Sequence, residues 1–101
     1  MDIKTFTEGQ TLHVSLSGDL NTLTAPKLSD CLDEMLIGME ALCVDFAYCD
    51  YVSSAGLRVL MAALGRLKDG EDSVRLINVG ENFMAVLEMT GLSEIFTVEA
   101  R

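Results

Sequence analysis

The chain has 101 residues, half of them hydrophobic, and its seven basic and sixteen acidic side chains leave a net charge of −9. This length allows a single core, so we expect one domain over residues 1–101. No apolar run approaches the roughly 20 residues that cross a bilayer, and residues 1–5 lack a signal-peptide pattern, so we expect a cytoplasmic protein without membrane insertion. The acidic balance argues against direct nucleic-acid binding.

The cysteines, Cys31, Cys43 and Cys49, are odd in number and form no Cys-x-x-Cys pair. A metal site would need further ligands, and His13, the only histidine, lies in another segment. We therefore expect no metal and no cofactor. Cys43 falls in an apolar strand and Cys31 on the inner side of a helix, which favours two small core residues in a reducing compartment.

The chain begins with two predicted strands, over residues 3–6 and 12–17, joined at Glu8-Gly9-Gln10. Apolar and polar residues alternate strictly along the second strand, which predicts an antiparallel hairpin with one face on a core. His13 then points to solvent or to a neighbouring strand. Residues 18–21 follow as a loop, which by itself favours an ordinary Asx turn.

Three helices follow in the sequence. Thr24 can cap the first, Pro26 is tolerated in its first turn, and Gly38 ends it. The second covers residues 54–68 and the third residues 81–90, each with apolar side chains at helical spacing. The other expected segments are strands over 42–46, 74–77 and 96–98, a polar turn over 68–72, and Gly91 as the C′ residue of the third helix.

The order of these elements is strand, strand, helix, strand, helix, strand, helix, strand. Such alternation predicts an α/β fold with a small mixed β-sheet, parallel central strands and right-handed crossovers. Three helices of this size cover one face of a small sheet more easily than both, so we expect the helices mainly on one face. No long exposed edge strand is evident, and a monomer is the simplest expectation.

Two adjacent serines, Ser53 and Ser54, lie where the strand over 42–46 leads into the second helix. The first amide groups of a helix lack partners and carry about half a positive charge, so an anion or a phosphoryl group is stabilised there. The serines alone favour an ordinary N-cap. Gly56 in the first turn costs up to about 1 kcal/mol relative to alanine. Close approach of a partner or of a packed neighbour would explain it.

The segment Asp-Tyr-Val-Ser-Ser-Ala-Gly-Leu-Arg, residues 50–58, resembles the signature of the STAS domain family, the anti-sigma-factor antagonists and their relatives. The element order matches that fold over essentially the whole chain. The resemblance implies a partner-switching regulator. Unphosphorylated, it would bind an anti-sigma factor that is also a serine kinase of the histidine-kinase-like ATPase class. Serine phosphorylation would release it, and a PP2C-type phosphatase would reset it.

Aligning on the Ala-Gly-Leu of residues 55–57 places Ser54 in the phosphorylated column, with Ser53 as the alternative and in a column where aspartate is common. Members with two serines before the glycine would put Ala55 in the second serine column. The Gly-Asp-Leu-Asn loop, residues 18–21, is similar to a family loop near the serine, with asparagine in place of aspartate. The partner-binding residues implied in this way are Asp19, Leu20, Asn21, Tyr51, Ser53, Ser54, Ala55, Gly56 and Arg58.

Two other functions remain open. Some STAS domains serve lipid-transport ABC complexes, so this chain could be an unphosphorylated soluble subunit of one or another non-sigma interaction module, which the serine pair disfavours. An enzyme is disfavoured because the sequence has no Ser-His-Asp order, Walker sequence or Gly-x-Gly-x-x-Gly fingerprint. Arg58 is expected to be exposed, as a solvated charge or as a partner of phosphate. Helical spacing favours core packing for Met61, Met84 and Met89 over an adaptable contact surface.

Overall fold

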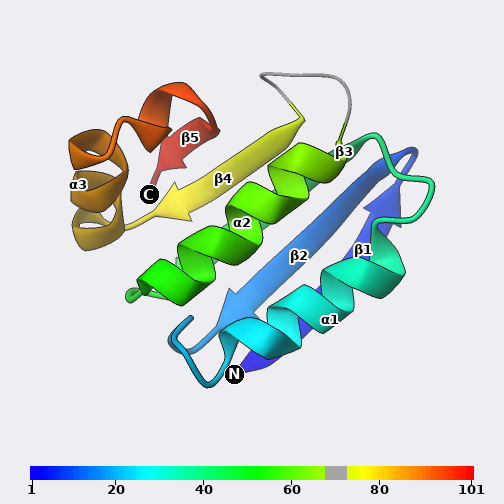
Figure 1. Ribbon diagram of the computed structural model, residues 1–101, viewed down its shortest axis with the longest axis horizontal. Helices are drawn as coiled ribbons and strands as arrows, with labels where there is room; N and C mark the ends of the chain where they lie inside the picture. The colour runs from blue at the N-terminus through cyan, green and yellow to red at the C-terminus, as the bar shows by residue number, and fades with distance from the viewer. Residues whose placement is uncertain (68–72) are drawn as a thin grey trace.

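The structure, a computed structural model, describes residues 1–67 and 73–101, and the predicted polar turn over 68–72 lies outside them. The described elements are drawn in Figure 1. They are the strands β1 (Asp2–Glu8), β2 (Thr11–Ser17), β3 (Ala41–Tyr48), β4 (Val74–Val79) and β5 (Thr97–Ala100), the helices α1 (Ala25–Met35), α2 (Ser54–Arg66) and α3 (Glu81–Met89), and the short 3-10 helix η2 (Leu92–Glu94).

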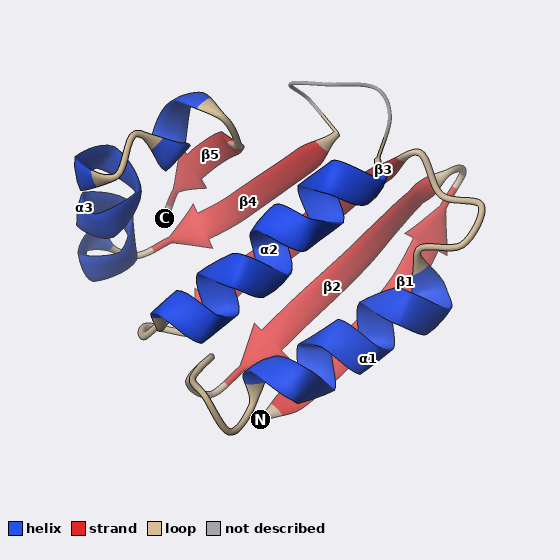
Figure 2. Cartoon of the chain, viewed as in Figure 1, coloured by secondary structure: helices blue, strands red, loops and turns tan. Residues whose placement is uncertain are grey.

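The five strands form one sheet in the order β1-β2-β3-β4-β5. β1 and β2 pair antiparallel, whereas β2–β3, β3–β4 and β4–β5 pair parallel. Figure 2 shows α1 and α2 side by side in front of the sheet. The predicted mixed sheet of the α/β class is therefore confirmed.

A single hydrophobic core lies between the helices and one face of the sheet. Alternate residues of β2, β3 and β4 enter it, and α3 joins it through Phe83, whose ring centroid lies 5.0 Å from that of Phe46 in β3. Each fully buried leucine or phenylalanine of this set contributes about 1.5–3 kcal/mol. Strict alternation in β2 thus fixes which face the helices cover. The alternating side chains are Leu12, Val14, Leu16, Leu42, Val44, Phe46, Val74 and Leu76, and Val79 at the end of β4 also belongs to the core.

The opposite face of the sheet, which we call the open face, carries mostly polar side chains. Strand register places Phe6 beside His13, His13 beside Cys43, and Cys43 beside Arg75 on this face. His13 stacks on Phe6 with ring centroids 4.4 Å apart, so it meets a neighbouring strand as the sequence predicts. Asp45 accepts hydrogen bonds from the Ala47 amide and from the side-chain amide of Asn78, each at 2.9 Å.

β1 is longer than the sequence predicts, because its pairing with β2 continues up to the turn. Glu8 pairs with Thr11, and Gly9 takes the left-handed conformation, with φ of 61°, that a two-residue hairpin turn needs. The result is a seven-residue strand at the edge of the sheet. The expectation that no long edge strand exists is therefore wrong, and with it the argument for a monomer.

Local signals place the helices well and their caps less well. Thr24 is the N-cap residue of α1, but its side chain makes no capping hydrogen bond, and the helix ends at Met35, ahead of Gly38. α2 ends at Arg66. Gly91 follows α3 in the left-handed conformation, as predicted, with φ of 76°.

Two methionines contradict the expectation of core packing. Met61 is 48% exposed and Met89 is 86% exposed, whereas Met84 packs partly against the core. Only one side of each helix packs on the core, so α2 and α3 bury fewer apolar side chains than the sequence predicts. No helix within residues 1–67 and 73–101 is long and apolar enough to span a membrane.

Candidate protein-interaction site

Two loops meet where β2 and β3 end. Leu20, in the loop after β2, forms an isolated parallel bridge with Val52, in the loop after β3. The Leu20 amide donates to the Tyr51 carbonyl at 2.9 Å, and the Ser53 amide donates to the Leu20 carbonyl at 2.8 Å. The structure therefore brings the predicted loop over residues 19–21 beside the predicted residues Tyr51 and Ser53.

The two serines have different places at the start of α2. Ser53 is the N-cap: its backbone is extended, and its Oγ accepts a hydrogen bond from the Gly56 amide at 3.4 Å. Ser54 is the first helical residue and is exposed. No hydrogen bond is found for the amides of Ser54 and Ala55 within the described ranges, so two donors point from the helix end toward solvent.

Gly56 is explained by a packed neighbour inside the protein. A Cβ at Gly56 would lie 2.7 Å from Leu20 Cγ and 3.1 Å from Val52 Cγ1. Leu20 is fully buried, and Gly56 is buried as well. These two residues support the site from beneath and do not present a surface to a partner.

The Asx turn that the sequence predicts for this loop is formed by Asn21. Its Oδ1 accepts from the amides of Leu23 and Thr24, at 2.9 and 3.1 Å. Thr24 Oγ1 in turn accepts from the Asn21 amide and donates to the Asp19 carbonyl at 2.7 Å. Asn21 therefore orders the loop and binds the amides of two residues that precede α1. The Asp19 side chain remains exposed.

Exposed apolar side chains lie on both loops and at the end of β3. Leu23 is 84% exposed, Tyr48 79% and Tyr51 55%. Sequence reasoning identified Tyr51 and missed the other two. Leu23 had a signal, as a lone leucine in a polar loop, and Tyr48 could be placed only once the end of β3 was known. Exposed aromatic and apolar groups of this kind are typical of protein-interaction surfaces. We call Asp19, Leu23, Tyr51 and Ser54 the strand-end surface. Tyr48 does not belong to it, because it lines a pocket of about 420 Å³ with Lys4 and Ser15.

Arg101 holds the loop after β3 in place through contacts of its guanidinium group. Its Nη2 donates to the Phe46 carbonyl at 2.7 Å, its Nε to the Asn78 carbonyl at 3.0 Å, and its Nη1 lies 2.7 Å from Asp50 Oδ1. The Asp50 carboxylate, three residues before Ser53 along the chain, is thereby paired with a cation. Sequence reasoning missed Arg101, because nothing local to β5 indicates contacts with β3.

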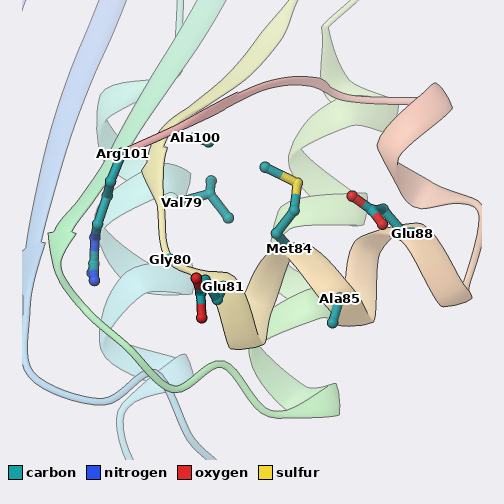
Figure 3. A pocket seen from close by; sticks show the side chains of 8 residues that line it. All are labelled: Val79, Gly80, Glu81, Met84, Ala85, Glu88, Ala100 and Arg101. Carbon is teal, nitrogen blue, oxygen red and sulfur yellow. The ribbon is translucent and has the colours of Figure 1, made fainter.

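An open pocket of about 500 Å³ lies beside Arg101, at the start of α3 (Figure 3). Arg101 borders it on one side, and Glu81 and Met84 border it on the other. A Cβ at Gly80 would lie 3.0 Å from Arg101 Nη1, so glycine leaves the room that the guanidinium fills. None of the predicted site residues lines this pocket.

The chemistry available at the two loops is that of binding. Cys49 is buried beside the site, and its Sγ lies 3.5 Å from the Tyr51 carbonyl. Burial raises the pKa of the Cys49 thiol, with Asp19 and Asp50 adding to the effect, so this thiol stays protonated and unreactive. Arg58 is exposed one turn along α2, as predicted. The described part of the chain holds no group of three potential metal ligands.

Comparison with known proteins identifies this arrangement. A small mixed sheet with helices on one face and two bonded loops at the strand ends defines a small α/β domain. The family model described as "Mlab, STAS domain" matches residues 3–98. The chain therefore belongs to the STAS domain family, as its sequence predicts.

The relatives and structures similar to this chain have consistent names. An anti-sigma-B factor antagonist from Staphylococcus epidermidis is 26% identical over 99 residues, which is 97% of this chain and 92% of the relative. An anti-sigma factor antagonist from Mycobacterium paratuberculosis has a similar structure, with a TM-score of 0.85 and 22% identity over 99% of this chain and 86% of that one. SpoIIAA of Bacillus in its phosphorylated form has a TM-score of 0.76 at 14% identity, over 99% and 92%. These structures confirm the predicted fold.

Proposed function

We propose that this chain is an anti-sigma factor antagonist that works as a partner switch. Unphosphorylated, it binds an anti-sigma factor that is also a serine kinase of the histidine-kinase-like ATPase class. Phosphorylated on a serine, it is released, and a PP2C-type phosphatase resets it. The exposed Ser54 at the first position of α2, amid the strand-end surface, is the observation that carries the proposal. The name of the Staphylococcus relative supports it.

Ser54 is the better phosphate acceptor of the two serines. The Ser53 hydroxyl already accepts a hydrogen bond from the Gly56 amide, as the N-cap of α2. A phosphate on Ser53 would break that hydrogen bond. Ser54 is exposed, and the described residues offer its hydroxyl no hydrogen bond that phosphorylation would break. Ser53 remains the alternative acceptor.

The physical effect of the phosphate differs between the free protein and the complex. A phosphoserine adds about 1.5–2 negative charges, and the helix dipole stabilises it by only about 0.3–1 kcal/mol, so the fold changes little. Within a packed interface the same charge must be desolvated, which costs several kcal/mol when no partner cation meets it. A loss of about 4 kcal/mol weakens binding roughly a thousandfold. The acidic chain, at −9, offers few cations of its own as compensation.

Intact-mass measurement after incubation with ATP and the candidate kinase tests the proposal. Wild type and Ser53→Ala are expected to gain one phosphoryl group, and Ser54→Ala none, with Ser29→Ala on α1 as a serine control. If Ser53→Ala alone failed to gain the phosphoryl group, the phosphorylated residue would be Ser53 and not Ser54. Calorimetric titration with the kinase is expected to show tight binding by unphosphorylated protein and about a thousandfold weaker binding after phosphorylation. Equal binding of both forms would refute the switch.

A second candidate is an unphosphorylated STAS subunit of a lipid-transport ABC complex, or another non-sigma interaction module. The matching family model is named for Mlab and not for an anti-sigma factor, and Ser53 stands where anti-sigma antagonists commonly have aspartate. Under this candidate the strand-end surface binds a constant partner. Absence of phosphorylation by every cognate kinase, together with co-purification of an ATPase subunit, would favour it.

A further inference from the structure

β1 forms an unprotected edge of the sheet. It pairs with β2 alone among the described strands, and residues 4–8 are all exposed. Figure 1 shows it as the outermost strand on the N-terminal side. A seven-residue edge presents unpaired amide and carbonyl groups to any strand that can align with it. Proteins usually block such edges with proline, bulges or charged side chains. β1 has no proline and pairs with β2 without a register shift, and its charged residues, Asp2, Lys4 and Glu8, include both signs and can pair with a second copy.

We propose that β1 pairs antiparallel with β1 of a second copy, with Phe6 facing Phe6 across a two-fold axis. In this register Lys4 lies opposite Glu8 of the second copy, and Glu8 lies opposite Lys4 of the second copy. Lys4, Phe6 and Glu8 are every second residue of β1, so their side chains project from the same face of the sheet. That face is the open face, because Phe6 stacks on His13 there. An interface of this kind is self-complementary, as a two-fold dimer requires.

The aromatic pair gives the axis its apolar contact. Phe6 is 58% exposed although its ring already stacks on His13, at 4.4 Å and 2° between planes. Facing residues of antiparallel strands place their Cβ atoms about 4.5–5.5 Å apart, so the rings form a row of four, from His13 of one copy to His13 of the other. On the other face of the sheet Thr5 meets Thr7 of the second copy, and β-branched pairs of this kind are favourable across strands.

The charges along β1 favour this register over those centred on Thr5 and on Lys4. A pairing centred on Thr5 would place Asp2 opposite Glu8 twice, and one centred on Lys4 would place the two lysines together. Both put like charges directly opposite, which destabilises a strand pair. The Phe6-centred register instead forms two ion pairs. Because each copy carries a net charge of −9, we expect a weak, reversible dimer.

Charge exchange tests the proposal with the unphosphorylated chain alone, independently of any kinase. Sedimentation equilibrium is run on wild type, Lys4→Glu, Glu8→Lys and the double variant. Each single change turns two ion pairs into two repulsions and is expected to raise the dimer Kd about tenfold. The double variant restores both pairs with reversed signs and is expected to return within about threefold of wild type. Lys27→Glu and Glu34→Lys, exposed on α1, change the net charge equally and should change the dimer Kd much less than the β1 variants do.

Several results would overturn the proposal. One is a wild type that remains monomeric at about 1 mM. Another is a dimer that neither single variant weakens, and a third is a double variant as weak as its parents. Strengthening by Glu8→Lys would indicate the Thr5-centred register, since Asp2 would then meet a lysine. Far-UV circular dichroism of each variant, expected to match wild type, separates loss of pairing from loss of fold.

Discussion

Gly56→Ala tests how tightly the two site loops are coupled. The new Cβ would lie 2.7 Å from Leu20 Cγ and 2.8 Å from Leu20 Cδ2. Cγ is the branch point of a fully buried side chain and not its flexible end, so the loop over 18–21 must move with it. That loop is held by the bridge between Leu20 and Val52, and the movement therefore reaches the serines.

Two opposing effects set the magnitude. Replacing glycine by alanine inside a helix gains up to about 1 kcal/mol. Overpacking a close-packed site costs about 1–3 kcal/mol. The net expectation is a loss of about 0–2 kcal/mol in the free energy of unfolding, and a larger effect on partner binding than on stability, because the displaced loop carries Asp19.

Urea unfolding with a matched control makes the comparison sharp. Gly65 lies in the same helix, and within the described residues nothing is found within 4 Å of its Cβ position. Gly65→Ala is therefore expected to stabilise the protein by up to about 1 kcal/mol. The difference between the two glycine variants is expected to be about 1–3 kcal/mol at an unchanged m-value.

A double-mutant cycle isolates the Leu20 contact. Leu20→Ala alone is expected to cost about 2–5 kcal/mol. In the Leu20→Ala background the alanine at 56 fills vacated space, so the double variant should be more stable than the sum of the two losses by about 1–2 kcal/mol. Additive losses, or a Gly56→Ala variant as stable as Gly65→Ala, would refute the coupling of the loops through this contact.

Three further predictions concern the caps, the arginine brace and the thiols. Ser53→Ala should lower the free energy of unfolding in urea by about 0.5–2 kcal/mol, because the N-cap is lost. Ser54→Ala should stay within about 0.5 kcal/mol of wild type. Equal losses in the two variants would contradict the cap assignment. Arg101→Ala should lower the free energy of unfolding by about 1–3 kcal/mol, mostly through loss of its hydrogen bonds to carbonyl groups. Asp50→Asn should lower it by less than about 1 kcal/mol, because the ion pair with Arg101 is half-exposed. A larger loss in Asp50→Asn than in Arg101→Ala would show that the ion pair dominates. Burial raises the pKa of the Cys43 and Cys49 thiols above the ordinary 9.0, so the folded state retains these protons longer than the unfolded state. The resulting stability is fully present below pH 9.0 and declines as the pH rises through the folded pKa values, and a flat profile in urea unfolding up to about pH 10 would contradict the burial of the thiols.

Much of the fold was predictable because its signals are local. Strict alternation over residues 12–17 identified both β2 and the face that it buries. A polar residue followed by apolar residues at helical spacing placed the start of α2 at Ser54, and the left-handed Gly91 was expected from its position after an apolar stripe. Each of these inferences depends on neighbours within a few positions along the chain.

The parts that were missed depend on distant neighbours. Leu20 lies in a short polar loop, and only its packing on Gly56 shows that it is a buried anchor. The exposure of Met61 and Met89 depends on how far the sheet extends beneath their helices. Arg101 could not be found at all, since its partners Phe46 and Asn78 lie on two other strands. The candidate serines were located from sequence, whereas the parts that hold them in place were not.

The order of strands in the sheet is also their order along the chain. No later strand is inserted between two earlier ones, so the sheet can grow from the β1–β2 hairpin by adding each new strand to the latest edge. The hairpin closes a very short loop, whereas each parallel pair must close a crossover through a helix, which is entropically more costly and slower. Folding is then expected to proceed from the N-terminal hairpin toward β5. Pulse-labelled hydrogen exchange during refolding would show this as protection of β1 and β2 before β4 and β5.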